Sequence, residues 1–231
     1  MIVSTPGLVL HATPYAETSV VAKVFTRQLG VCSYLVKGVR GRGGRMKQNL
    51  FEPLCSLDMV VYDSRRGELN YIKELSPRHP AQPSEPIANA LRFFMTEVLY
   101  KALQEQEPMP SLWDYVEEMA EGRLEVPVGQ LPVVFMLDVA HHLGIAPLDN
   151  YSLREPLFDL QEGRFVSKST GTTLSPVLSA ALHTYLTMPQ IPHSNKEERM
   201  ALLDALIVYF QLHLSGFRHF HSHEILHTIL T

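Results

Sequence analysis

A glycine-rich segment, residues 37–47, concentrates the side chains of this sequence that could contact a phosphate backbone. It reads KGVRGRGGRMK and contains no carboxylate. Its four glycines disfavour both a stable helix and a packed strand, so the segment is predicted to be a loop. Cations on a loop can neutralise phosphates and release condensed counterions. The alternative is a solvated connection that binds nothing. The five cations are Lys37, Arg40, Arg42, Arg45 and Lys47.

The charge of the chain is divided along its length. Residues 1–50 carry seven Lys or Arg and one acid, Glu17, a net charge of +6. The whole chain carries −4, so residues 51–231 carry −10. This separation indicates an anionic partner at the N-terminal end, because the remaining surface would repel nucleic acid. Lys23 and Arg27 join the five loop cations as candidate nucleic-acid contacts.

Composition indicates a folded protein. The 231 residues are 45% hydrophobic, which is ample for one large domain or two small ones. The two cysteines, Cys32 and Cys55, lie in apolar, strand-like runs and are expected to be buried thiols in a reducing compartment. No secretory leader is recognisable, and no window reaches ~18 apolar residues. We therefore expect a cytoplasmic protein without a membrane span.

Residues that could carry catalysis do not converge. The P-loop, GxGxxG, HExxH and GxSxG patterns are absent, and the turn 168–171 has no partner base. The pair His223 and His227 could share a helix face and bind a metal together with His219 or His221, but no carboxylate or thiol completes an obvious tetrahedral set. We predict no enzymatic activity, no cofactor and no metal. A histidine-based metal enzyme is the less favoured alternative.

The first 80 residues have a β pattern. Five short runs are rich in β-branched residues and separated by turns, and the first of them ends at Pro14. Five strands in this length fit an OB-type barrel, with an SH3-like barrel as the competing choice. Tyr34, in the third run, could stack on bases or fill the barrel core. The runs are 8–10, 19–26, 31–36, 57–62 and 69–75.

A proline-rich segment, 76–86, ends this pattern, since neither strand nor helix continues through its four prolines. Helical periodicity follows, with Ser84 as a candidate N-cap. The predicted organisation is therefore an α+β chain with a barrel domain, 1–80, and a mainly helical domain, 81–231. A small β-hairpin is expected near 155–168.

The helical domain offers a second kind of candidate site. Its apolar content would allow a groove for an acidic, hydrophobic peptide, with Arg92, Lys101 or Arg123 holding the carboxylates. Residues 81–231 carry a net charge of −9, so such a peptide would need a local cation. The alternative is that these three cations pair with nearby acids on exposed helix faces. The candidate acids are Glu97, Glu105 and Glu121.

Four segments carry a resemblance to a known family. They are GLVLHATPYAETSVVAKVFTRQLGVCSYLVKGVRG at residues 7–41, NLFEPLCSLDMVVY at 49–62 and, more loosely, HHLGIAPLDN at 141–150 and the helix after His219. Through these segments nearly the whole chain resembles the bacterial DNA repair protein RecO family. The resemblance implies an OB-fold domain that binds single- and double-stranded DNA, followed by a helical domain. It also implies a recombination mediator that anneals strands, partners RecR, contacts the tail of the single-strand binding protein and helps to load RecA.

The sequence departs from that family at one place. Many members carry a four-cysteine zinc site just after the segment that corresponds to 141–150. Here residues 148–155 contain no cysteine. The hairpin that zinc would brace is therefore expected to be held by packing of Phe158 and Phe165. An RNA-binding module is the remaining alternative, because Arg42-Gly43-Gly44-Arg45 looks like a fragment of an RGG segment.

Overall fold

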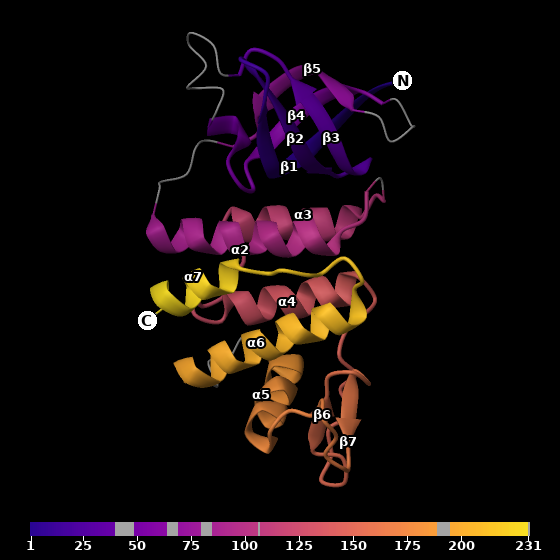
Figure 1. The fold of residues 1–231 in the computed structure, drawn as a ribbon, viewed down its shortest axis with the longest axis vertical. Coiled ribbons are helices and arrows are strands. Elements are labelled where there is room, and N and C mark those ends of the chain that lie inside the picture. Colours follow the sequence, from indigo (N-terminus) through magenta and orange to yellow (C-terminus); the bar gives the residue numbers. More distant parts are fainter. Residues whose placement is uncertain (40–48, 64–68, 80–84, 106, 189–194, 231) are drawn as a thin grey trace. The chain divides into compact units, whose positions relative to one another are not determined.

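The computed structural model describes residues 1–39, 49–63, 69–79, 85–105, 107–188 and 195–230. The chain divides into two compact units, Met1–Arg123 and Leu124–Thr231. The first contains a β-barrel with two helices, and the second contains the remaining helices and a small hairpin (Figure 1).

Five strands close into a barrel in the order β1-β2-β3-β5-β4, with β4 returning to β1. Every neighbouring pair is antiparallel except β3 and β5, which run parallel. This is the predicted five-stranded OB-type barrel. Its core contains small and β-branched side chains together with Tyr34 and Phe51. The strands are β1 (Ile2–Tyr15), β2 (Ser19–Thr26), β3 (Gly30–Val36), β4 (Ser56–Tyr62) and β5 (Asn70–Pro77).

Strand β1 is much longer than the short run predicted from the sequence, and it contains Pro6 and Pro14. It pairs with β4 over Ile2–Leu8 and with β2 over Gly7–Tyr15. Each proline therefore lies where β1 has only one neighbouring strand. A proline lacks the N–H that a second neighbour would need, so these positions tolerate it. Strand β1 thus ends one residue after Pro14, close to the predicted end, but it begins at Ile2 rather than at Leu8.

Helices α2 (Pro86–Ala102) and α3 (Pro110–Ala120) belong to the same compact unit as the barrel. The N-cap of α2 is Glu85, whereas the predicted cap, Ser84, lies outside the described residues. At Gly30 the backbone has φ 69°, and a Cβ atom would lie only 2.4 Å from the carbonyl oxygen of Glu107. A glycine at this turn thus lets the chain that precedes α3 approach the barrel closely.

The second unit is built from helices α4 (Leu131–His142), α5 (Pro176–Thr187), α6 (Lys196–His213) and α7 (Ser222–Ile229). Strands β6 (Leu157–Asp159) and β7 (Arg164–Val166) form a two-stranded antiparallel hairpin inside the predicted range. The rings of Phe158 and Phe165 are both fully buried and meet edge to face at 5.1 Å. The predicted packing of Phe158 against Phe165 is therefore observed. None of the described helices combines the length and apolar character that a membrane crossing requires.

Candidate nucleic-acid interface

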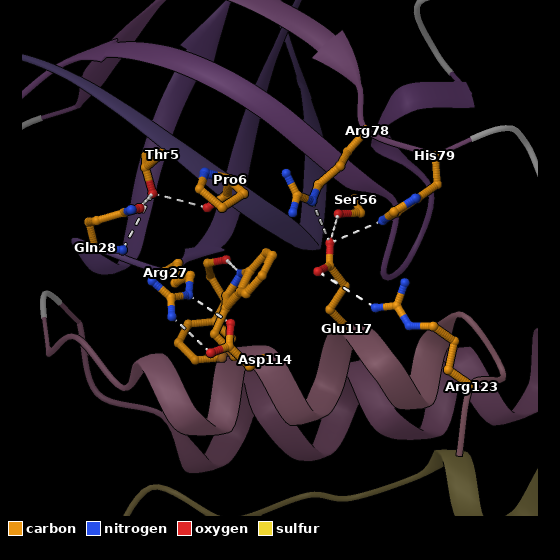
Figure 2. A network of polar contacts seen from close by, with 12 residues as sticks. Thr5, Pro6, Arg27, Gln28, Ser56, Arg78, His79, Asp114, Glu117 and Arg123 are labelled. Carbon is orange, nitrogen blue, oxygen red and sulfur yellow. Dashed lines mark hydrogen bonds and ion pairs between the residues drawn. The ribbon is translucent and has the colours of Figure 1, made fainter. Parts of the chain in front are cut away.

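Helix α3 is joined to the barrel by a two-point ion pair. Nε of Arg27, just after β2, lies 2.7 Å from Oδ1 of Asp114, and its Nη2 donates to Oδ2 at 2.9 Å (Figure 2). Next to Asp114 on the helix, Trp113 is almost completely buried and its Nε1 donates to the carbonyl oxygen of Phe25 at 2.9 Å. The charge of Arg27 is therefore already paired with a carboxylate of its own compact unit.

A second acid of α3, Glu117, gathers groups from three segments (Figure 2). Its Oε1 accepts from the Ser56 hydroxyl at 2.8 Å and from Nε of Arg78 at 2.8 Å, and it lies 3.3 Å from Nε2 of His79. Its other oxygen lies 3.8 Å from Nη2 of Arg123. Glu117 is only 7% exposed, so this carboxylate requires these partners.

These contacts change proton affinities in the expected directions. The hydrogen bond between Arg27 and Asp114 raises the pKa of Arg27 and holds the pKa of Asp114 below its usual value. Burial opposes the charge of Arg78, but its contacts with Asp58 and Glu117 outweigh burial and raise the pKa of Arg78. Both arginines therefore stay charged while their carboxylate partners neutralise them.

Lys23, the other cation predicted from β2, also has partners. Its Nζ lies 3.0 Å from Oε1 of Glu105 and 4.8 Å from the centre of the Tyr100 ring. The aromatic face and the carboxylate both favour the ammonium. Glu105, predicted as a partner for a helical cation, thus contacts the barrel instead.

The barrel surface around the end of β3 has a different character. Lys37 is exposed, and its Nζ lies 6.0 Å from the centre of the Tyr71 ring on β5. Tyr71 is 49% exposed and lies opposite Tyr62, which is 46% exposed on β4. Among the described residues, no carboxylate lies within salt-bridge distance of Lys37. The other four loop cations, Arg40, Arg42, Arg45 and Lys47, lie outside the described residues.

Tyr34 does not take part in any surface. Its side chain is 0% exposed within the barrel core, and burial raises its pKa. Of the two roles considered for it, the structure confirms the core role.

The three helical cations predicted to hold a peptide occupy separate positions on α2 and after α3. Nη1 of Arg92 donates to Oδ1 of Asn89 at 3.4 Å. Nζ of Lys101 lies 3.6 Å from Oε1 of Glu97, one turn before it on α2. Arg123 belongs to the Glu117 cluster described above. Pairing on helix faces, the alternative drawn from the sequence, is thus observed for Lys101, and Arg123 pairs with Glu117 rather than with Glu121.

The C-terminal histidines lie on and before α7. Nε2 of His227 is 3.0 Å from Oδ1 of Asp204 on α6, and the rings of His223 and His227 meet edge to face at 6.0 Å. His219 and His221 precede the helix. Across the described part of the chain, no three His, Cys, Asp or Glu side chains are grouped as metal ligands would be.

Sequence reasoning missed the two acids that cover the cations at one end of the barrel. Asp114 and Glu117 are three residues apart, so they share a face of α3 beside the buried Trp113. A helix face with two acids, in a chain whose first 50 residues carry +6, was a usable signal. It also missed Tyr62 and Tyr71, because alternation alone does not distinguish an exposed aromatic residue from a buried one.

Comparisons with known proteins agree with this arrangement. A family model described as "Recombination protein O N terminal" matches residues 1–81. The chain is similar along 99% of its length to a DNA repair protein RecO of Christiangramia forsetii, at 27% identity over 240 residues and 99% of that protein. It is 28% identical over 243 residues to one of Porphyromonas gingivalis, again with 99% of both chains covered. A third, from Flavobacterium johnsoniae, is 27% identical over 239 residues, with both chains covered completely.

Proposed function

We propose that the chain, which is similar along nearly its whole length to DNA repair proteins RecO, is a non-enzymatic recombination mediator that binds DNA through its barrel. The proposal rests on which cations of the barrel are paired with carboxylates of the protein. Arg27 and Arg78 face carboxylates of α3, and Lys23 faces Glu105. Lys37 and the basic segment that follows it in the sequence provide the remaining positive charge for phosphates.

We assign DNA binding to residues 1–80 and treat it as mainly electrostatic. Lys37 and the loop cations make the principal phosphate contacts. Lys23 and Arg27 make smaller contributions, because each must exchange a carboxylate of the protein for a phosphate. Such contacts position a nucleic acid without reading its sequence, so all sequences are bound with similar affinity.

The more specific activities that we propose depend on the same positive charge of the barrel region. Contacts to phosphates serve single- and double-stranded DNA, and they lower the repulsion between two complementary strands that are being annealed. Loading of RecA onto strands covered by single-strand binding protein requires partners, and we propose RecR and the tail of the single-strand binding protein in these roles. The support is the family relationship and the charge division described above.

For the tail peptide we retain Arg92, Lys101 and Arg123 of the helical region as candidate carboxylate contacts. Lys101 forms an i,i+4 pair with Glu97 on α2, so an incoming carboxylate would have to compete with Glu97 for the ammonium. Each cation is replaced singly by Ala, and a labelled acidic tail peptide is titrated into each variant. Parent-like binding by all single variants and by the triple variant would place the peptide elsewhere.

The DNA proposal is tested with a fluorescent single-stranded oligomer. In one variant Arg40, Arg42 and Arg45 are changed to Glu, which should weaken binding of every sequence alike. The matched control reverses three exposed cations of the second unit, Arg154, Arg164 and Lys168, and so produces the same change in net charge. The control should bind like the parent. Equal affinity of the loop variant and the parent would remove the loop from the mechanism.

An RNA-binding module is the second candidate, favoured by the Arg42–Arg45 pattern. A protein distinguishes RNA from DNA through contacts to the 2′-hydroxyl, whereas phosphate contacts are shared by both. Equal-length DNA and RNA strands of the same sequence are compared side by side. A clear preference for RNA would favour the RNA-binding module over the DNA-repair role.

A further inference from the structure

Two exposed tyrosines lie directly opposite each other on the barrel. Tyr62 ends β4, Tyr71 begins β5, and the antiparallel register pairs them across the two strands. Opposite residues of an antiparallel pair have Cβ atoms about 4.5–5.5 Å apart and project from the same face. The two residues are 46% and 49% exposed, so both side chains are accessible to solvent next to each other. On the other side of Tyr62, Ile2 of β1 is also exposed and extends the apolar surface.

A groove adjoins this pair where the barrel is least tightly closed. Strands β3 and β5 are joined by only two register pairs, Tyr34 with Asn70 and Leu35 with Tyr71, and then diverge. The space between them is a groove of about 390 Å³. Tyr71 lies at its edge, and its other lining residues are mainly apolar side chains and two lysines. These are Leu35, Val36, Lys37, Val39, Leu50, Phe51, Ile72, Lys73 and Leu75.

The charges beside the groove suit a phosphate backbone. Lys37 lies over the Tyr71 ring and forms no ion pair with a described residue. Lys73 contacts its neighbour Glu74 at 3.3 Å, but both side chains are exposed, so this ion pair contributes little and can be exchanged for a phosphate.

We propose that Tyr62 and Tyr71 form a stacking platform for the unpaired bases of a single strand, whose phosphates are held by Lys37 and Lys73 beside the groove. The inference rests on the proposed DNA-binding function and identifies its preferred substrate as unpaired DNA. Every base has a flat aromatic face, so stacking accepts all sequences. Bases inside a duplex are already stacked on one another and cannot use the platform. The loop cations therefore serve both forms of DNA, whereas the tyrosine pair serves single strands.

A structural role is the competing explanation, because cross-strand aromatic pairs also stabilise sheets. The two roles differ in what they require from the ligand. A stacking platform requires bases, whereas a tyrosine pair that only supports the barrel affects every ligand equally. A strand of abasic residues has the phosphates of DNA without its bases, so it separates the two explanations.

The experiment compares an oligothymidine with an abasic oligomer of equal length, each labelled at one end. The parent protein should bind the oligothymidine at least about fivefold more tightly, the lower bound for one stacked base. Changing both tyrosines to Leu, which keeps apolar bulk, should abolish this preference without weakening binding of the abasic strand or of duplex DNA. Changing both to Phe should retain the preference. Phe93→Ala, at an exposed aromatic residue of α2 in the same compact unit, is the control and should bind like the parent.

The possible outcomes are distinguishable. A Leu variant that keeps the parent's preference for bases overturns the platform and leaves the loop-based function intact. Equal weakening for both strands by the Leu variant shows a structural role and also overturns it. If the parent protein binds neither strand nor duplex, the proposed function itself fails.

Discussion

Removal of the Glu117 side chain should loosen α3 from the barrel. In Glu117→Ala the hydroxyl of Ser56 and the guanidinium of Arg78 both lose an acceptor that lies 2.8 Å away. Ser56 is only 5% exposed, so water cannot readily replace the lost carboxylate. The helix would then be held to this part of the barrel chiefly by Trp113 and by the ion pair of Asp114.

The magnitude follows from the two donors. A buried donor left without an acceptor costs about 1–3 kcal/mol, which applies to Ser56. The Arg78 side chain is 37% exposed and also contacts Asp58 at 3.0 Å. Because water and Asp58 can still solvate it, loss of its contact with Glu117 should cost only about 0.5–1 kcal/mol. We expect a total loss of about 1.5–4 kcal/mol in the free energy of unfolding, a shift of roughly 10- to 900-fold in the unfolding equilibrium. Glu117→Gln retains an acceptor oxygen and should lose only about 1 kcal/mol.

The assay uses Trp113, the only tryptophan in the chain, which is buried where α3 contacts the barrel. Its fluorescence reports on this unit during unfolding in urea. Glu118→Ala, at the exposed neighbouring position of α3, is the matched control and should change stability by less than about 0.5 kcal/mol. The reasoning is refuted if Glu117→Ala is as stable as the Glu118 control.

Three further outcomes are expected. A chelator should leave the melting temperature unchanged and elemental analysis should find no stoichiometric zinc, whereas a bound metal would revive the histidine-enzyme alternative. Asp159 and Asp114 both have a lowered pKa. Burial opposes ionisation of Asp159, but hydrogen bonds from nearby hydroxyl and backbone groups outweigh burial and lower its pKa. The hydrogen bond from Arg27 lowers the pKa of Asp114. The two carboxylates therefore stabilise the fold at pH values above their unfolded pKa of 3.8, and this stabilisation is lost as the pH falls through their lower folded pKa values. Urea unfolding at pH 7 and at pH 3 measures the loss, and an unchanged midpoint would contradict it. Phe165→Ala removes the ring that packs on Phe158 and should lower the free energy of unfolding by about 3–5 kcal/mol, as measured by urea unfolding. A loss below about 1 kcal/mol would show that this packing does not stabilise the hairpin.

Strand positions were largely predictable because alternation and β-branching are local properties. The run 19–26 matches β2, and 31–36 and 57–62 each lie within one residue of β3 and β4. The length of β1 was not predictable in the same way. Its extension back to Ile2 depends on pairing with β4, which is a property of the closed barrel rather than of the local sequence.

The candidate site was predictable in type but only partly in its members. Clustering of cations identified the N-terminal region, since charge is visible in composition. Which cations remain available depends on partners distant in the sequence: Arg27 pairs with Asp114, and Lys23 with Glu105. No spacing rule in one sequence joins residues so far apart. The compact unit continues to Arg123, past the boundary predicted near residue 80, and contacts such as that of Trp113 with Phe25 also join residues far apart in the sequence.

The salt dependence of single-strand binding tests the central claim most directly. If Lys37 and the four following loop cations each neutralise one phosphate, the logarithm of the association constant plotted against the logarithm of salt concentration should have a slope of about −3.5, at ~0.7 per contact. Reversal of Arg40, Arg42 and Arg45 to Glu should reduce the slope to about −1.4 or less in magnitude. The second-unit reversal variant should keep the parent's slope. A loop variant whose slope equals that of the parent would contradict electrostatic binding by this part of the barrel.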